Sequence, residues 1–150
     1  MAKRKSQIVN DGSDSRTENS LRPDVIVEIL FEQGLLFISV SNIGNRPALG
    51  VAVKFSRKIV GLDGRKDVSS LALFRNIEFL GPGREIVTFL DACSSYFARK
   101  QPTKISARVS YADSEKRKYE VTINHDLEIY RELAYLDGVR PQTRSSDRLD

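Results

Sequence analysis

The feature that most constrains the fold is the alternation of apolar residues with other residues in short runs. Val25, Val27, Ile29 and Phe31 occupy every second position, and a period of two places them on one face of a β-strand. Further strand-like runs follow, separated by turn residues, at 36–40, 49–55, 77–79, 86–90, 105–111 and 119–123. The sequence therefore predicts an all-β antiparallel sandwich of seven or eight strands.

Two pairs of neighbouring runs are predicted to form β-hairpins. Gln33 and Gly34 turn the chain after the first run, and a polar stretch at 113–118 separates the last two runs. Residues 68–75 fit either a short strand or a helical turn, and residues 91–103 are predicted to be a loop.

The two ends of the chain differ from the middle in composition. Residues 1–22 and 139–150 are polar and offer little to bury, so they are predicted to be a disordered N-terminal arm and C-terminal tail. The sandwich domain is predicted to span residues 23–138.

The one predicted helix covers residues 126–137. Asp126 is placed to cap it, Glu128 lies in its first turn, and Gly138 is placed to end it. An apolar stripe recurs at three-residue steps, and it either packs across one open end of the sandwich or docks into a partner. The stripe consists of Leu127, Tyr130, Leu133 and Leu136.

Three short motifs resemble a known family. Residues 40–48 read V-S-N-I-G-N-R-P-A, and with Val51 and Val53 they are similar to the V-x-N-x-G-x-x-P-A-x-x-V-x-V opening of CARDB-like domains of bacteria and archaea. Residues 80–83 (L-G-P-G) resemble the L-x-P-G turn of these domains, and residues 109–113 (V-S-Y-A-D) resemble one of their hairpins.

The resemblance implies an immunoglobulin-like β-sandwich over roughly residues 24–126, since such a sandwich takes about 100 residues. It also implies a scaffolding or adhesion module of bacterial or archaeal surface or membrane-linked proteins. The chain itself carries no apolar stretch after its basic start and no run long enough to span a membrane. A cytoplasmic location is therefore predicted for the chain as written, and a membrane-linked setting if it is a fragment.

Composition excludes several classes of site. A single cysteine rules out a disulfide within the chain, and a single histidine rules out any site with two imidazoles. Lys and Arg number 24 against 20 Asp and Glu, and the net charge of +4 is spread thinly along the chain. Such a distribution does not demand a nucleic-acid partner.

Few residues suggest reaction chemistry. No spacing brings Cys93 and His125 together as a nucleophile and base, and residues 81–84 (G-P-G-R) lack the Lys and the helix of a phosphate-binding loop. Four aspartates in predicted loops lack the spacing of a calcium loop: Asp63, Asp67, Asp91 and Asp113. No enzyme activity, catalytic residue, cofactor or metal ion is predicted.

A non-enzymatic protein-binding or scaffolding module remains as the main hypothesis. The end loops at 42–47 and 91–103, together with exposed strand edges, are predicted to contact a protein partner. The alternative is a nucleic-acid-binding module that uses a basic-aromatic loop at 96–108. The residues predicted to bind a partner are Tyr96, Phe97, Arg99, Lys100, Asn45 and Arg46.

Overall fold

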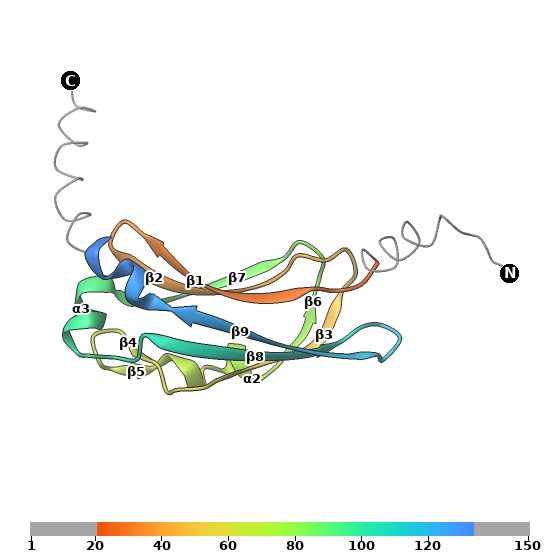
Figure 1. Cartoon of the computed structure of the whole chain (residues 1–150). Helices are drawn as coiled ribbons and strands as arrows, with labels where there is room; N and C mark the ends of the chain where they lie inside the picture. The colour runs from red at the N-terminus through yellow and green to blue at the C-terminus, as the bar shows by residue number, and fades with distance from the viewer. Residues whose placement is uncertain (1–20, 134–150) are drawn as a thin grey trace, which may run out of the picture.

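A computed structural model describes residues 21–133 as two antiparallel β-sheets packed face to face (Figure 1). The predicted tail at 139–150, and the predicted arm up to residue 20, lie outside the described residues. One sheet has the strand order β1-β2-β7, with β1 at Val25–Glu32, β2 at Leu35–Asn42 and β7 at Glu85–Ala92. The other has the order β6-β3-β8-β9, with β3 at Ala48–Phe55, β6 at Ile77–Leu80, β8 at Lys104–Ala112 and β9 at Lys118–Asp126.

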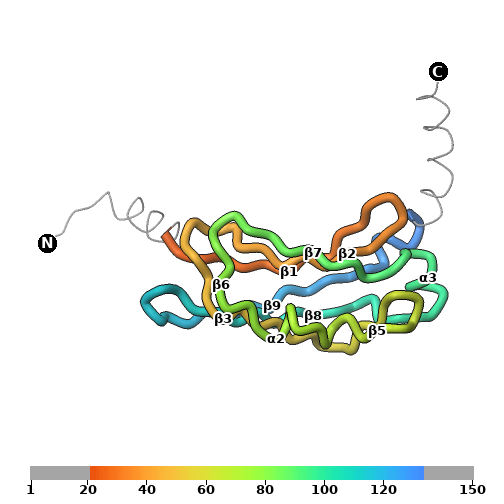
Figure 2. Tube along the Cα trace, turned by 180° about the vertical axis from the view of Figure 1, so that it is seen from behind, coloured from red at the N-terminus to blue at the C-terminus, as the bar shows by residue number. Residues whose placement is uncertain are grey.

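Shorter elements join these strands. The two-residue strands β4 (Val60–Gly61) and β5 (Lys66–Asp67) pair with each other. The helical segments are η1 (Val68–Ser70), α2 (Ala72–Arg75), α3 (Cys93–Ala98) and η2 (Leu127–Tyr130). Seen from behind, α3 lies at the opposite end of the sandwich from the point where the chain enters β1 (Figure 2).

The predicted all-β antiparallel sandwich is confirmed. Both predicted hairpins form: β1 pairs with β2 from Val25 opposite Asn42 to Glu32 opposite Leu35, and β8 pairs with β9 along their whole lengths. The backbone at Gln33 and Gly34 has positive φ values of 50° and 82°. Two consecutive residues with positive φ form a tight β-turn, and the twist of this turn matches the twist of the two strands that it joins.

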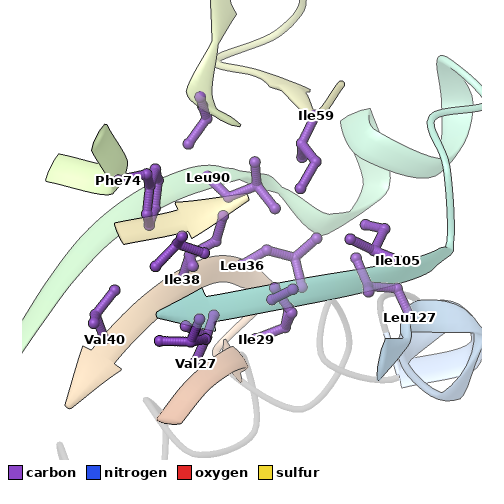
Figure 3. Packing of buried hydrophobic residues seen from close by; sticks show 14 of the residues in the cluster. Val27, Ile29, Leu36, Ile38, Val40, Ile59, Phe74, Leu90, Ile105 and Leu127 are labelled. Carbon is purple, nitrogen blue, oxygen red and sulfur yellow. The ribbon is translucent and has the colours of Figure 1, made fainter. Parts of the chain in front are cut away.

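The alternating residues form the core between the sheets. The inward side chains of β1, β2 and β8 meet there, and Ile59, Phe74 and Leu127 close it from the connecting segments (Figure 3). Phe74 packs edge to face against Phe55, with ring centroids 5.0 Å apart. Burial of this apolar area is the main stabilising contribution to the fold.

The predicted loop at 91–103 is wrong in part, and the open alternative at 68–75 is decided in favour of helical turns. Residues 91–103 are not a loop throughout, because β7 continues to Ala92 and α3 follows directly at Cys93–Ala98. Residues 68–75, which fit either a short strand or a helical turn, form the helical segments η1 and α2. In both places the local pattern is too short to distinguish strand, loop and helix, and packing against the sandwich decides.

The C-terminal helical segment begins at Leu127, one residue after the predicted start at 126, and Asp126 accepts a hydrogen bond from Glu128 N at 3.0 Å. Its first turn is a 3₁₀ turn, and residues 134–137 lie outside the described residues. Leu127 is fully buried, and Tyr130 stacks on Phe31 with ring centroids 5.4 Å apart. The segment therefore packs across one end of the sandwich.

Candidate functional site

The outer side of the β1-β2-β7 sheet carries an unusual number of apolar side chains. Their strand positions alternate with those of the core residues, so they point away from the other sheet. We call this surface the apolar face, and its members are Ile26, Leu30, Leu35, Phe37, Val87 and Phe89.

Strand pairing gathers these side chains into one patch. Phe37 lies directly opposite Phe89 in the β2–β7 register, and their rings make an edge-to-face contact at 5.7 Å. Val87, 47% exposed, lies two residues before Phe89 in β7, and Leu35 and Phe89 are each 37% exposed. A contiguous exposed apolar patch on a protein surface marks an interaction site.

Ser39 lies in the middle of the apolar face, between Glu28 of β1 and Val87 of β7 in the register. Its side chain is fully covered by its neighbours, and its Oγ has no hydrogen-bond partner within the described chain. An unsatisfied hydroxyl lowers stability unless a further group reaches it.

The charged side chains on the outer side of these three strands have one sign. Glu28, Glu32 and Glu85 are exposed and occupy outward positions on the edge strands of the sheet. None of the described residues in β1, β2 or β7 is Lys, Arg or His. Within these three strands, the apolar face is therefore bordered by negative charge, and the nearest cation in the sequence is Arg84, in the turn before Glu85.

The aromatic residues predicted to bind a partner are not on the surface. Tyr96 is fully buried, with its hydroxyl donating to Pro102 O at 2.5 Å, and burial raises the pKa of Tyr96 to about 12. Phe97 is 8% exposed, and the Arg131 guanidinium lies 4.4 Å from its ring centroid. The prediction that these two side chains are available to a partner is wrong, because α3 turns both toward the core.

The basic residues near Tyr96 and Phe97 lie in different places and do not share one role. Arg99 pairs with the buried carboxylate of Asp91 and also donates to Val60 O at 3.2 Å, so it holds α3 against β7 and β4. Lys100 is exposed just after α3, with a positive φ of 56°. Lys104 and Arg108, further along the predicted basic-aromatic stretch at 96–108, lie on β8. That stretch does not form one basic-aromatic cluster.

Asn45 and Arg46 are exposed in the loop between β2 and β3, as a contact role requires. Arg46 lines a hollow of about 590 Å³ at this end of the sandwich, together with Arg22, Arg117 and Tyr119. The Arg22 guanidinium lies 5.8 Å from the Tyr119 ring centroid. Arg22 therefore belongs to the fold and not to the N-terminal arm to which the sequence assigned it.

The cysteine and the histidine have separate hydrogen-bonding neighbours. The Cys93 thiol donates to Tyr130 O at 3.8 Å, whereas the His125 ring hydrogen-bonds with the backbone of Val27. Burial lowers the pKa of His125 below its ordinary value of 6.5.

The loop aspartates have protein partners. Asp91 accepts from Asp63 N and Ala92 N, Asp67 accepts from Ser69 Oγ, and Asp113 accepts from the Tyr119 hydroxyl at 2.8 Å. Within residues 21–133, no three His, Cys, Asp or Glu side chains come together in a group that could hold a metal ion. In the same part of the chain, no helix has both the length and the apolar character needed to cross a membrane.

Sequence reasoning missed the apolar face. The alternation places Ile26 and Leu30 on the outer side of the first strand, where they are mixed with glutamates. Phe37 and Phe89 are far apart in the sequence and become neighbours only when β2 pairs with β7. One available signal was the absence of Lys and Arg from three of the apolar runs, at 25–32, 35–42 and 85–92.

The fold and these surfaces define an all-β sandwich domain with one apolar, acid-bordered face. The chain belongs to the family described as a domain of unknown function (DUF8453), whose model matches residues 2–131. The match covers all of the strands. No curated protein matches the chain.

Proposed function

We propose that this protein is a non-enzymatic protein-binding module of immunoglobulin-like type, and that the apolar face is its main contact surface. The observation that carries the proposal is the patch of apolar side chains around Phe37 and Phe89, on three strands whose outward charged residues are all glutamates. Aromatic side chains at the centre of a patch with a polar rim are typical of the residues that dominate binding energy.

The immunoglobulin-like classification is supported by the strand order. Without the two-residue strands, the chain runs through seven strands that form the sheets β1-β2-β7 and β6-β3-β8-β9. The constant-type immunoglobulin sandwich differs in one respect, because its fourth strand is at the edge of the sheet that contains the first strand. The turn motifs that resemble CARDB-like domains lie at 40–48 and 80–83, between strands of this arrangement. We also propose for this module the cytoplasmic location that the sequence predicts.

Charge complementarity indicates the chemistry of the partner. A second copy docked symmetrically through the same face would bring Glu28, Glu32 and Glu85 of both copies together, and like charges oppose such contact. A partner with apolar side chains flanked by Lys or Arg matches both the patch and its rim. The edge of β7 before Leu90 offers additional backbone hydrogen bonds to a partner strand, while the Leu90 carbonyl itself accepts from Leu62 N at 2.9 Å.

A photocrosslinking experiment tests the proposal. A photoreactive phenylalanine analogue at Val87, on the apolar face, is expected to crosslink a protein in extract of the source cells. The same analogue at Ser110, an exposed position on β8 of the other sheet, is the matched control. Mass spectrometry then identifies both the protein and the crosslinked segment.

Two features of the product decide the outcome. The proposal requires a product from position 87 that is absent from position 110, and a crosslinked segment that carries apolar residues next to Lys or Arg. Equal products from both positions, a segment rich in Asp or Glu, or no protein product at all would contradict it.

A further inference from the structure

Basic side chains line a different part of the sandwich, beside α2 and along β3. The backbones of these two elements lie next to each other in Figure 2. Two adjoining hollows of about 650 Å³ and 250 Å³ share Lys54, Phe55 and Ser56 as lining residues. The first extends past Arg57 and Lys58 to α2, and the second extends across β8 and β9. We call the two together the basic groove; its cationic lining residues are Lys54, Arg57, Lys58, Arg75 and Arg108.

The charge of the basic groove is almost uncompensated. No Asp or Glu is among the residues that line either hollow. Glu120 lies 3.6 Å from Arg108 at one end, in a pair whose side chains are both exposed, and Asp67 is engaged by the hydroxyl of Ser69. An exposed ion pair of this kind adds little stability, so Arg108 can exchange its partner for another anion.

The polar groups of the basic groove suit an anionic ligand. Lys54, Arg57 and Lys58 are all exposed, and Lys54 is opposite Arg108 in the β3–β8 register. Ser56 Oγ accepts a hydrogen bond from Ser106 N at 2.9 Å, which leaves its hydroxyl hydrogen for a ligand oxygen. Guanidinium, ammonium and hydroxyl donors together are the groups that bind phosphate oxygens.

The basic groove lacks what a protein interface uses. Phe74 is 1% exposed and Phe55 is half-buried against it, so neither ring is offered as an apolar anchor. None of the exposed large apolar side chains of the described chain lines either hollow. This surface differs in kind from the apolar face, where aromatic and aliphatic side chains lie in the open.

From the cations, the hydroxyl and the extended shape, we infer that the basic groove binds the phosphodiester backbone of a single-stranded nucleic acid. Several cations spaced along a groove match a ligand with repeated charge better than a single phosphate group. The absence of an exposed aromatic ring from its lining predicts contacts with phosphates and not with bases, so binding is independent of sequence. DNA and RNA strands share this backbone chemistry.

The test is a titration of the full chain with fluorescein-labelled dT12 and rU12, followed by fluorescence anisotropy at several salt concentrations. Contacts with about four phosphates give a slope of about −3 in a plot of log association constant against log salt concentration. The two strands are expected to bind within about threefold of each other, since the basic groove reads only the backbone.

Charge reversal locates the binding. Lys54→Glu with Lys58→Glu is expected to weaken binding at 50 mM salt at least about tenfold and to halve the slope, because about two phosphate contacts are lost. Arg84→Glu with Lys118→Glu makes the same change in net charge at exposed positions outside the basic groove, and is expected to change affinity less than twofold. Thermal melting checks that both variants fold.

Three results would overturn the inference. These are no binding of either strand at 50 mM salt, equal loss of affinity in both double variants, and displacement of dT12 by a twelve-residue poly-glutamate peptide at equal concentration. A much tighter complex with rU12 than with dT12 would contradict the backbone-only mode. Because Val87 and Phe89 are unchanged in these variants, the result is independent of the protein-binding proposal.

Discussion

Replacing Asp91 by alanine is expected to lower the free energy of unfolding by about 3–4 kcal/mol, because it breaks a buried ion pair and leaves several donors without an acceptor. The Asp91 residue is 2% exposed, and its carboxylate accepts hydrogen bonds from the Arg99 side chain, Asp63 N and Ala92 N. Through these contacts it joins the end of β7 to α3 and to the turn after β4. Urea unfolding followed by circular dichroism measures the change.

Two further variants make this prediction specific. Asp91→Asn keeps an acceptor of the same shape without the charge, so its loss is expected to be smaller than that of Asp91→Ala. Glu120→Ala breaks the exposed pair with Arg108 and is expected to cost less than about 1 kcal/mol. A loss for Asp91→Ala no larger than that for Glu120→Ala would show that the buried pair does not hold α3 in place.

Asn42→Ala is expected to cost about 3 kcal/mol, since the side chain of Asn42 satisfies four backbone groups that alanine cannot reach. Its Oδ1 accepts from Asp24 N and Gly44 N at 3.1 and 3.0 Å, and its Nδ2 donates to Arg46 O and Leu80 O at 2.8 and 3.1 Å. Asn42 is fully buried. It therefore ties the start of β1, the β2–β3 loop and the end of β6 together.

The control for this prediction is Asn45→Ala, three residues further on in the same loop and exposed. Its expected cost is within about 0.5 kcal/mol, as for an ordinary surface substitution. Both are measured by urea unfolding at neutral pH. If Asn42→Ala cost less than about 1 kcal/mol, water would be replacing the amide, and the loop would not depend on this residue.

The β-strands could be predicted from the sequence because each carries its own pattern. Val25, Val27 and Ile29 alternate with outward residues whatever the rest of the chain does, and the two hairpins follow from turns between neighbouring runs. Turn residues can also be recognised locally, and Gly83, in the L-G-P-G turn at 80–83, has a positive φ of 76° that glycine adopts without strain. Local patterns are sufficient for these elements.

Helix α3 could not be predicted in this way. Its six residues begin after Ala92 with no side-chain cap, and they include two serines, which favour turns. What stabilises it is non-local: Arg99 reaches back to Asp91, and Tyr96 and Phe97 pack into the core. The same two aromatic side chains suggested a binding loop to sequence reasoning, because an exposed and a buried aromatic pair look alike in a short polar segment.

The apolar face and the basic groove could not be predicted from the sequence for a related reason. Each combines residues distant in sequence: Phe37 meets Phe89 across the β2–β7 pair, and Lys54 meets Arg108 across the β3–β8 pair. Arg108 was already part of the predicted nucleic-acid stretch at 96–108, but its companions in the basic groove come from β3, from the segment that follows β3 and from α2. Composition alone, with a net charge of +4, showed no separation of charge between the faces.

The central claim is that the apolar face binds a basic-apolar segment of another protein. Its most direct test is the dissociation constant of the purified crosslinked partner for the wild-type chain, for Val87→Lys and for Ser110→Lys. Val87→Lys places a repelling charge on the apolar face and is expected to weaken binding at least about 30-fold, which corresponds to a loss of about 2 kcal/mol, while Ser110→Lys leaves it within about twofold. An unchanged dissociation constant for Val87→Lys, or an equal loss for Ser110→Lys, would contradict the claim.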